Sequence, residues 1–138
     1  MRVKVLESIY RKQHERLFGY LMRMLGDYDV SRDILQDTFT RCLERYGRTI
    51  DSTALLYRIA RNLAVDHLRK RVQIEPLQEL QADETEHQDR QLMVKEHCRA
   101  VLHALQSMPL ADREVLSLVA SETLTYRDIA MILETSES

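Results

Sequence analysis

Residues 56–69 read LYRIARNLAVDHLR, and this stretch decides the fold because apolar and basic side chains recur in it at intervals of three and four. That spacing is typical of an amphipathic α-helix. One side is apolar and is expected to face the core; it carries Leu56, Ile59, Ala60, Leu63 and His67. The opposite side is basic and carries Arg58, Arg61, Asn62, Val65 and Arg69.

The same periodicity extends in both directions from this helix. Ahead of it we predict helices over about 5–25 and 30–46, which end at Gly26 and Gly47, and the quoted stretch itself is predicted helical over about 52–71 with a cap from Asp51 or Ser52. Behind it we predict helices over about 91–108, from Pro109, and from a capping box at Thr125–Asp128, with a turn at 134–136. Only three Gly and two Pro interrupt the chain, so the predicted fold class is all-α.

Some of these helices carry apolar side chains that are expected to be buried. In the second helix they are Leu35, Phe39, Cys42, Leu43 and Tyr46, and in the fourth Leu92, Val94, Cys98, Val101, Leu102 and Leu105. The fifth helix is expected to bury Leu110, Val115, Leu116 and Val119, and the last one Ile129, Ile132 and Leu133.

Charge divides the chain more sharply than its net value of -2 suggests. Residues 53–72 carry five cations against one acid, whereas residues 73–96 carry seven acids against two cations. We therefore predict two small helical domains, 1–72 and 92–138, joined by an acidic linker at 73–91.

Several classes of protein are not expected. No run of apolar residues is long enough for a membrane span and the N-terminus lacks a signal peptide, so the expected location is cytoplasmic. Cys42 and Cys98 are expected to be reduced and buried, and the spacing of His87, His97, Cys98 and His103 is poor for zinc. No phosphate-binding loop or nucleophile motif is present, so we expect no cofactor, no metal, no small-molecule substrate and no catalysis.

The polar surfaces of two helices leave alternatives open. Arginines on the helix at 52–71 can neutralise phosphates and Asn62 can read or hold a base, but an ordinary solvated face has the same composition. On the second helix, the outward residues Asp33, Gln36, Asp37 and Arg41 fit either a protein-docking surface or plain solvation.

Three blocks of the chain, LFGYLMRMLGD at 17–27, SRDILQDTF at 31–39 and the stretch at 56–69, together resemble the second conserved region of extracytoplasmic-function sigma factors of the sigma-70 family. Residues 98–138 resemble the fourth region of that family, a helix-turn-helix. The resemblance implies binding to core RNA polymerase, through its β′ clamp helices and β flap, to promoter DNA, and to an anti-sigma factor. The acidic linker is then expected either in the RNA exit path of the polymerase or against the basic helix, where it would suppress DNA binding by the free protein.

The resemblance also implies roles for particular residues. The surface that holds the β′ clamp helices corresponds to Asp33, Leu35, Gln36, Asp37 and Phe39. The element that opens and reads the minus-ten sequence corresponds to the loop 47–52 with Arg58, Arg61, Asn62 and His67, and the basic end of the same helix adds Arg69, Lys70 and Arg71.

Two features depart from the family pattern. First, Leu55 stands where an aromatic residue is usual. Second, only Glu137 and Ser138 follow the turn that precedes the recognition helix of the fourth region, so we expect a chain shortened before this second DNA-binding element. The alternatives are a helical interaction module that binds polymerase or an anti-sigma factor without reading DNA, and a dimeric DNA-binding regulator whose N-terminal bundle senses a ligand.

Overall fold

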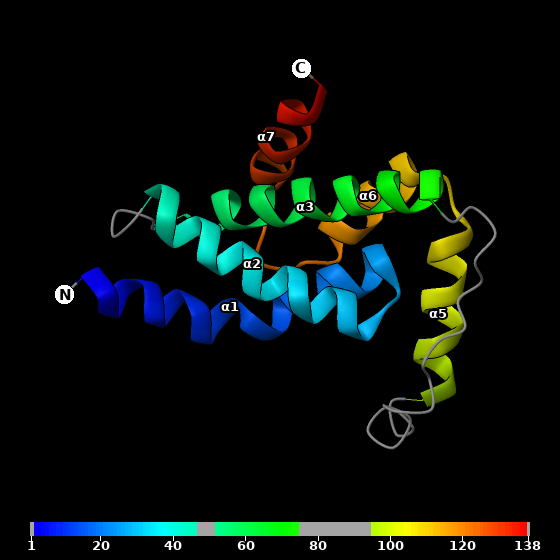
Figure 1. The fold of residues 1–138 in the computed structure, drawn as a ribbon, viewed down its shortest axis with the longest axis horizontal. Helices are drawn as coiled ribbons and strands as arrows, with labels where there is room; N and C mark the ends of the chain where they lie inside the picture. Colours follow the sequence, from blue (N-terminus) through cyan, green and yellow to red (C-terminus); the bar gives the residue numbers. More distant parts are fainter. Residues whose placement is uncertain (1, 47–51, 75–94, 138) are drawn as a thin grey trace.

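The computed structural model describes residues 2–46, 52–74 and 95–137, and these residues form an all-α fold with no strand among them (Figure 1). The helices are α1 (Arg2–Leu25), α2 (Tyr28–Tyr46), α3 (Thr53–Ile74), α5 (Lys95–Ser107), α6 (Leu110–Val119) and α7 (Tyr126–Glu137). The all-α prediction is confirmed. Most of the predicted acidic linker lies outside the described residues, and residues 73 and 74 belong to the end of α3.

Local sequence signals fix the ends of these helices. Gly26 ends α1 with a positive φ of 68°, and the Asp27 side chain accepts a hydrogen bond from the Val30 backbone at 3.1 Å to start α2. The Ser52 hydroxyl accepts one from the Leu55 backbone at 3.3 Å at the start of α3. The capping box is also present: the Asp128 backbone donates to the Thr125 hydroxyl at 3.0 Å and the Thr125 backbone donates to the Asp128 carboxylate at 3.1 Å.

One hydrophobic core joins helices from both ends of the chain. Its centre lies between α1, α2 and α3, where the rings of Tyr20 and Tyr57 meet edge to face at a centroid distance of 5.5 Å. Leu118 from α6 and Ile129 and Ile132 from α7 belong to the same buried cluster. Figure 1 shows α7 crossing α3, so α7 covers a side of α3 that α1 and α2 leave open.

This cover changes which residues of α3 are buried. Leu56 and Ala60 are buried as predicted, while Ile59, Leu63 and His67 are only half-buried. Tyr57, Ala64 and Val65 are buried as well. The prediction that Val65 belongs to the outward basic face is therefore wrong, because α3 is packed on two sides rather than one.

The orientation of α6 is the reverse of the prediction. Its buried residues are Arg113, Glu114, Ser117 and Leu118. Val115, Leu116 and Val119, which were expected in the core, are 45%, 46% and 48% exposed. The polar side of α6 faces inward because side chains and carbonyl groups of α1 and α3 supply it with charged and hydrogen-bonding partners.

Four smaller predictions are also wrong. Leu43 is 49% exposed, Val101 is 56% exposed and Cys98 is exposed, so α2 and α5 each bury a narrower stripe than their composition suggests. The turn expected at 134–136 is helical, since α7 continues to Glu137 in a segment with neither Gly nor Pro to stop it.

The two thiols should differ strongly in reactivity. Burial raises the pKa of the Cys42 thiol to about 11, whereas Cys98 is exposed, and the thiolate is the reactive form. We expect a thiol reagent to modify one cysteine rapidly in the native protein and both in denaturant. The Cys98→Ser variant should lose the rapid phase, and two rapid phases in the native wild type would contradict the burial of Cys42.

Candidate functional site

The outward surface of α2 is polar and lies over a buried apolar pair. Asp33 and Gln36 are exposed, and the half-buried Asp37 forms an ion pair with Arg41, at 3.5 Å between the carboxylate and the guanidinium. Leu35 and Phe39 are 3% and 8% exposed and belong to the core. Of the five predicted polymerase-binding residues, three are therefore available at the surface, and two hold α2 in place beneath them.

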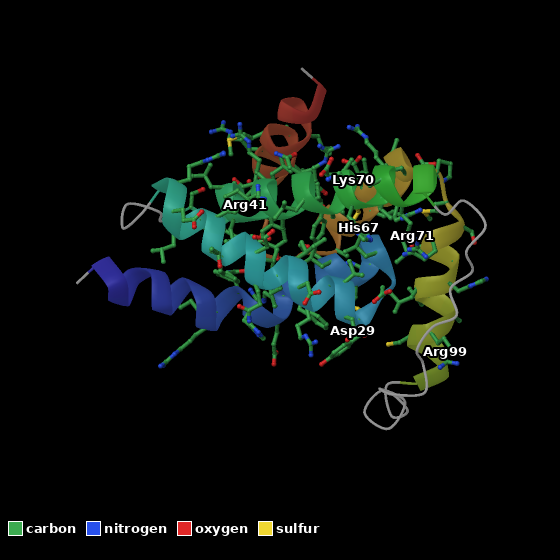
Figure 2. The ribbon with its side chains drawn as sticks, in the orientation of Figure 1. Asp29, Arg41, His67, Lys70, Arg71 and Arg99 are labelled. Atoms are coloured by element: carbon green, nitrogen blue, oxygen red, sulfur yellow. The ribbon has the colours of Figure 1, made fainter. Side chains whose placement is uncertain are left out.

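The predicted DNA-binding residues on α3 differ in how far they are exposed to solvent. Asn62, Arg69 and Lys70 are exposed, although Lys70 is paired with Asp66 at 3.3 Å. Arg58, His67 and Arg71 are half-buried. Figure 2 places His67, Lys70 and Arg71 together on the C-terminal half of the helix.

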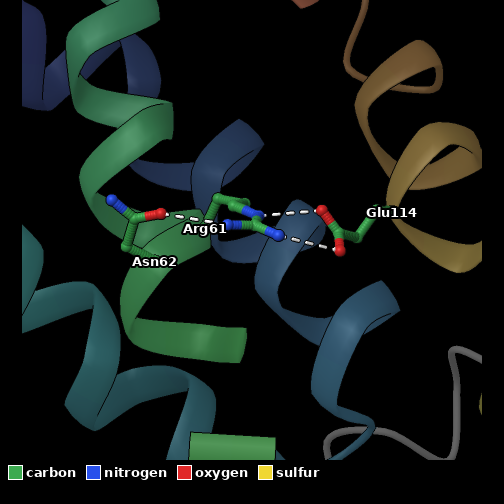
Figure 3. A network of polar contacts seen from close by, with 3 residues as sticks. All are labelled: Arg61, Asn62 and Glu114. Atoms are coloured by element: carbon green, nitrogen blue, oxygen red, sulfur yellow. Dashed lines mark hydrogen bonds and ion pairs between the residues drawn. The ribbon is translucent and has the colours of Figure 1, made fainter. Parts of the chain in front are cut away.

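Arg61 is buried, in contrast to its predicted place on an outward face. Its Nε donates to Glu114 Oε1 at 2.8 Å and its Nη2 donates to Glu114 Oε2 at 3.0 Å (Figure 3). Its third donor, Nη1, binds Asn62 Oδ1 at 3.1 Å. Each of the three nitrogens of the guanidinium therefore has a partner within the protein, and the guanidinium in turn holds the amide oxygen of Asn62.

A shallow hollow of about 420 Å³ lies between α2 and α3. Its lining is rich in arginine and includes Arg41, Arg45, Arg61, Asn62, Asp66 and Arg69. Arg41, which is labelled in Figure 2, and Arg45 lie about one helical turn apart on α2. The sequence analysis did not place these two arginines beside α3, although two arginines four residues apart near the end of a helix are a visible signal.

The imidazole of His67 has a lowered pKa. Its partial burial is the main cause and the nearby charge of Arg71 adds to it, while Asp27 and Asp66 act in the opposite direction and Lys70 acts with Arg71. His67 is therefore mainly neutral at pH 7, so it adds little positive charge to the basic end of α3.

Two kinds of site are not found in the described part of the chain. No group of three His, Cys, Asp or Glu side chains is placed to hold a metal ion there. None of the described helices is long and apolar enough to cross a membrane. His87, Leu92 and Val94 lie outside the described residues, and the side chains of Tyr46 and His97 are also outside them.

Known proteins resemble the chain over nearly its whole length. The family model "Sigma-70 region 2" matches residues 9–73, which is most of α1 and all of α2 and nearly all of α3. "ECF RNA polymerase sigma factor SigX" of Bacillus subtilis is 29% identical, over 98% of this chain and 75% of that protein. "RNA polymerase sigma-H factor" of Pseudomonas aeruginosa is 25% identical, over 95% and 76%.

A third relative, "ECF RNA polymerase sigma factor SigM" of Bacillus subtilis, is 23% identical over 96% of this chain and 84% of that protein. No solved structure matches the chain significantly. The alignments with these relatives cover nearly all of this chain and so extend beyond the region 2 match into α5, α6 and α7.

The lowered pKa of His67 should make stability fall in mildly acidic solution. The unfolded chain takes up a proton at His67 below pH about 6.5, whereas the folded protein resists it until a lower pH. The stability that neutral His67 provides is thus complete above that pH and is lost as pH falls toward the lowered pKa. Urea midpoints measured from about pH 7.5 to about pH 5.5 should fall more for the wild type than for His67→Gln, with His103→Gln as the exposed control. Equal slopes in all three proteins would contradict this role.

Proposed function

The chain belongs to the extracytoplasmic-function group of the sigma-70 family, whose members act in transcription initiation, and we propose that it binds core RNA polymerase through α2 and presents α3 to promoter DNA. The action is binding rather than catalysis. The observation that carries the proposal is the arginine-lined hollow between α2 and α3, which lies within the region 2 match.

The polymerase surface in this proposal is the outward side of α2. Asp33, Gln36 and Asp37 supply charge and hydrogen-bonding groups, and the family resemblance assigns the β′ clamp helices as their partner. Leu35 and Phe39 fix the orientation of the helix from below. Charged groups at the rim of such an interface determine which partner binds and how fast, because complementary charges steer the encounter.

The DNA surface in this proposal is the hollow with the adjoining part of α3. Arg41, Arg45 and Arg69 can bind phosphates around it, and Asn62 lies exposed among them with an amide that can hydrogen-bond a base. A pocket that holds an unstacked base offsets the few kcal/mol that unpairing costs, so strand opening does not require ATP. Leu55 packs against the core, and the loop at 47–51 lies outside the described residues.

A second candidate function is supported by α6. Its exposed apolar side, Val115, Leu116 and Val119, is the kind of surface that a protein partner covers. The resemblance implies the β flap of polymerase or an anti-sigma factor as that partner. In this alternative the chain acts as a protein-interaction module, and the hollow between α2 and α3 does not read DNA.

Reversing the charge of Asp37 should weaken polymerase binding. In gel filtration with core RNA polymerase, we expect the wild type to co-elute, Asp37→Arg to lose most co-elution, and the exposed control Glu15→Arg to retain it. The reason is that a rim charge of the wrong sign repels the partner surface. A folded wild type that fails to co-elute would contradict the proposal.

Removing arginines from the hollow should weaken promoter binding in a salt-dependent way. Promoter DNA selected by the wild-type holoenzyme from a random library serves as the ligand. We expect Arg45→Gln and Arg69→Gln each to reduce the slope of log affinity against log salt by about one, the value for one lost phosphate contact. Arg99→Gln on α5 is the control, and unchanged slopes for both hollow variants would favour the interaction-module alternative.

A further inference from the structure

The contact of α5 and α6 with the end of α1 is held by polar groups. Arg113 Nη1 donates to the Met24 carbonyl at 2.8 Å, and Gln106 Nε2 donates to the Arg23 carbonyl at 3.0 Å. In the opposite direction, Arg23 Nη2 donates to the Ser117 carbonyl and to the Ser121 hydroxyl, each at 2.9 Å. The last carbonyl groups of α1 thus receive partners from α5 and α6.

The contact with α3 is the bidentate pair of Arg61 and Glu114. The two side chains are 8% and 10% exposed, and both oxygens of the carboxylate accept hydrogen bonds from the guanidinium (Figure 3). Arg61 also lines the hollow between α2 and α3. A residue of α6 therefore occupies the hydrogen-bonding edge of an arginine that borders the proposed DNA surface.

A carboxylate and a phosphate are alternative partners for that edge. Both present two oxygens at a spacing that matches the planar fork of an arginine. Since Glu114 already takes Nε and Nη2, a DNA phosphate cannot bind Arg61 in the same way while α6 stays in place. Binding of α6 and binding of a phosphate at this edge exclude each other.

The buried side of α6 is mostly polar, which favours a helix that can separate from its neighbours. The buried side of the helix contains Arg113, Glu114 and Ser117 and only one large apolar residue, Leu118. The apolar residues Val115, Leu116 and Val119 stay nearly half exposed. At α6 the contact therefore resembles the polar interfaces of units that move relative to one another. Its apolar part lies mainly in α7, whose Ile129 and Ile132 belong to the shared core.

We infer that the described arrangement is a closed form in which Glu114 takes the place of a DNA phosphate on Arg61, and that α6 must leave α3 before the full basic surface binds DNA. The inference rests on the proposed function, because it concerns the regulation of the same DNA surface. Free protein then binds DNA weakly, and its apparent affinity is reduced by the fraction of molecules that are open.

The first test compares two charge reversals on α6. Glu114→Lys removes the partner of Arg61, and Asp112→Lys, at an exposed position of the same helix, changes the net charge equally. The ligand is a fluorescent single-stranded DNA of random sequence, and its anisotropy is measured with the free protein. We expect Glu114→Lys to bind about tenfold more tightly than Asp112→Lys, which corresponds to a closed form in about tenfold excess.

A second substitution shows whether the gain comes from Arg61. In the double variant Arg61→Gln, Glu114→Lys the gain should disappear. No gain in Glu114→Lys over its control, or a gain that persists without Arg61, would overturn the inference. If Glu114→Lys does not fold, the isosteric Glu114→Gln is compared with Asp112→Asn in the same assay.

Energy transfer tests the movement itself. Dyes are attached to the exposed Cys98 of α5 and to a cysteine introduced at the exposed Thr40 of α2, while the buried Cys42 stays unlabelled. Transfer should fall in Glu114→Lys and stay high in Asp112→Lys. Tighter DNA binding without a fall in transfer would show that α6 does not leave, and this would also overturn the inference.

Co-elution with core polymerase separates this inference from the proposed function. A wild type that co-elutes, with no gain in DNA binding for Glu114→Lys, keeps the proposed function and loses the closed form. A gain that depends on Arg61, in a chain that does not co-elute, keeps the closed form and removes the polymerase role.

Discussion

The arrangement of the helices depends on the buried bidentate pair of Arg61 and Glu114. A guanidinium keeps its charge in a protein, so a buried arginine needs partners that compensate the charge, and for Arg61 the carboxylate of Glu114 is that partner. Removing one partner of such a pair typically costs about 3–5 kcal/mol, because the remaining charge has no compensation. The pair therefore ties α6 to α3, and the buried face of α6 is the face that carries Glu114.

The same requirement explains the contacts at the end of α1. A helix ends with carbonyl groups that have no partner within the helix, and here Gln106 and Arg113 supply donors to the last turn. Gly26 makes this approach possible, since a Cβ at that position would lie 2.9 Å from the side chain of Gln106. Arg23, Arg113 and Arg61 together make the docking of α6 specific in orientation, although the net free energy of such polar contacts is modest.

The sequence predicted well what depends on local interactions and poorly what depends on distant ones. The stop at Gly26, the capping box at Thr125 and most helix boundaries follow from neighbours along the chain, and the structure confirms them, whereas α7 continues through the turn predicted at 134–136. The burial of Val65 and Arg61 and the exposure of Val115 and Leu116 depend on which helix covers α3, and periodicity within one helix does not contain that information. An acid against the basic helix was expected from charge, but it was assigned to the linker, whereas Glu114 holds this place among the described residues. The division of the chain into two domains and the roles of the site residues stay predictions.

The inverted orientation of α6 gives that helix two usable faces. If α6 buried its apolar side permanently, the free energy gained from Val115, Leu116 and Val119 would favour a single packed state. Instead the polar face is used inside the chain and the apolar face remains available to a partner. A partner that covers the apolar face without disturbing Glu114 leaves the closed form intact, whereas one that needs α6 elsewhere must replace the pair with Arg61. The guanidinium accepts a carboxylate or a phosphate with the same geometry, so loss of the internal pair does not leave Arg61 without a partner once DNA is bound. The cost of breaking a buried ion pair is then offset at the site where the new contact forms, which couples the movement of α6 to DNA binding.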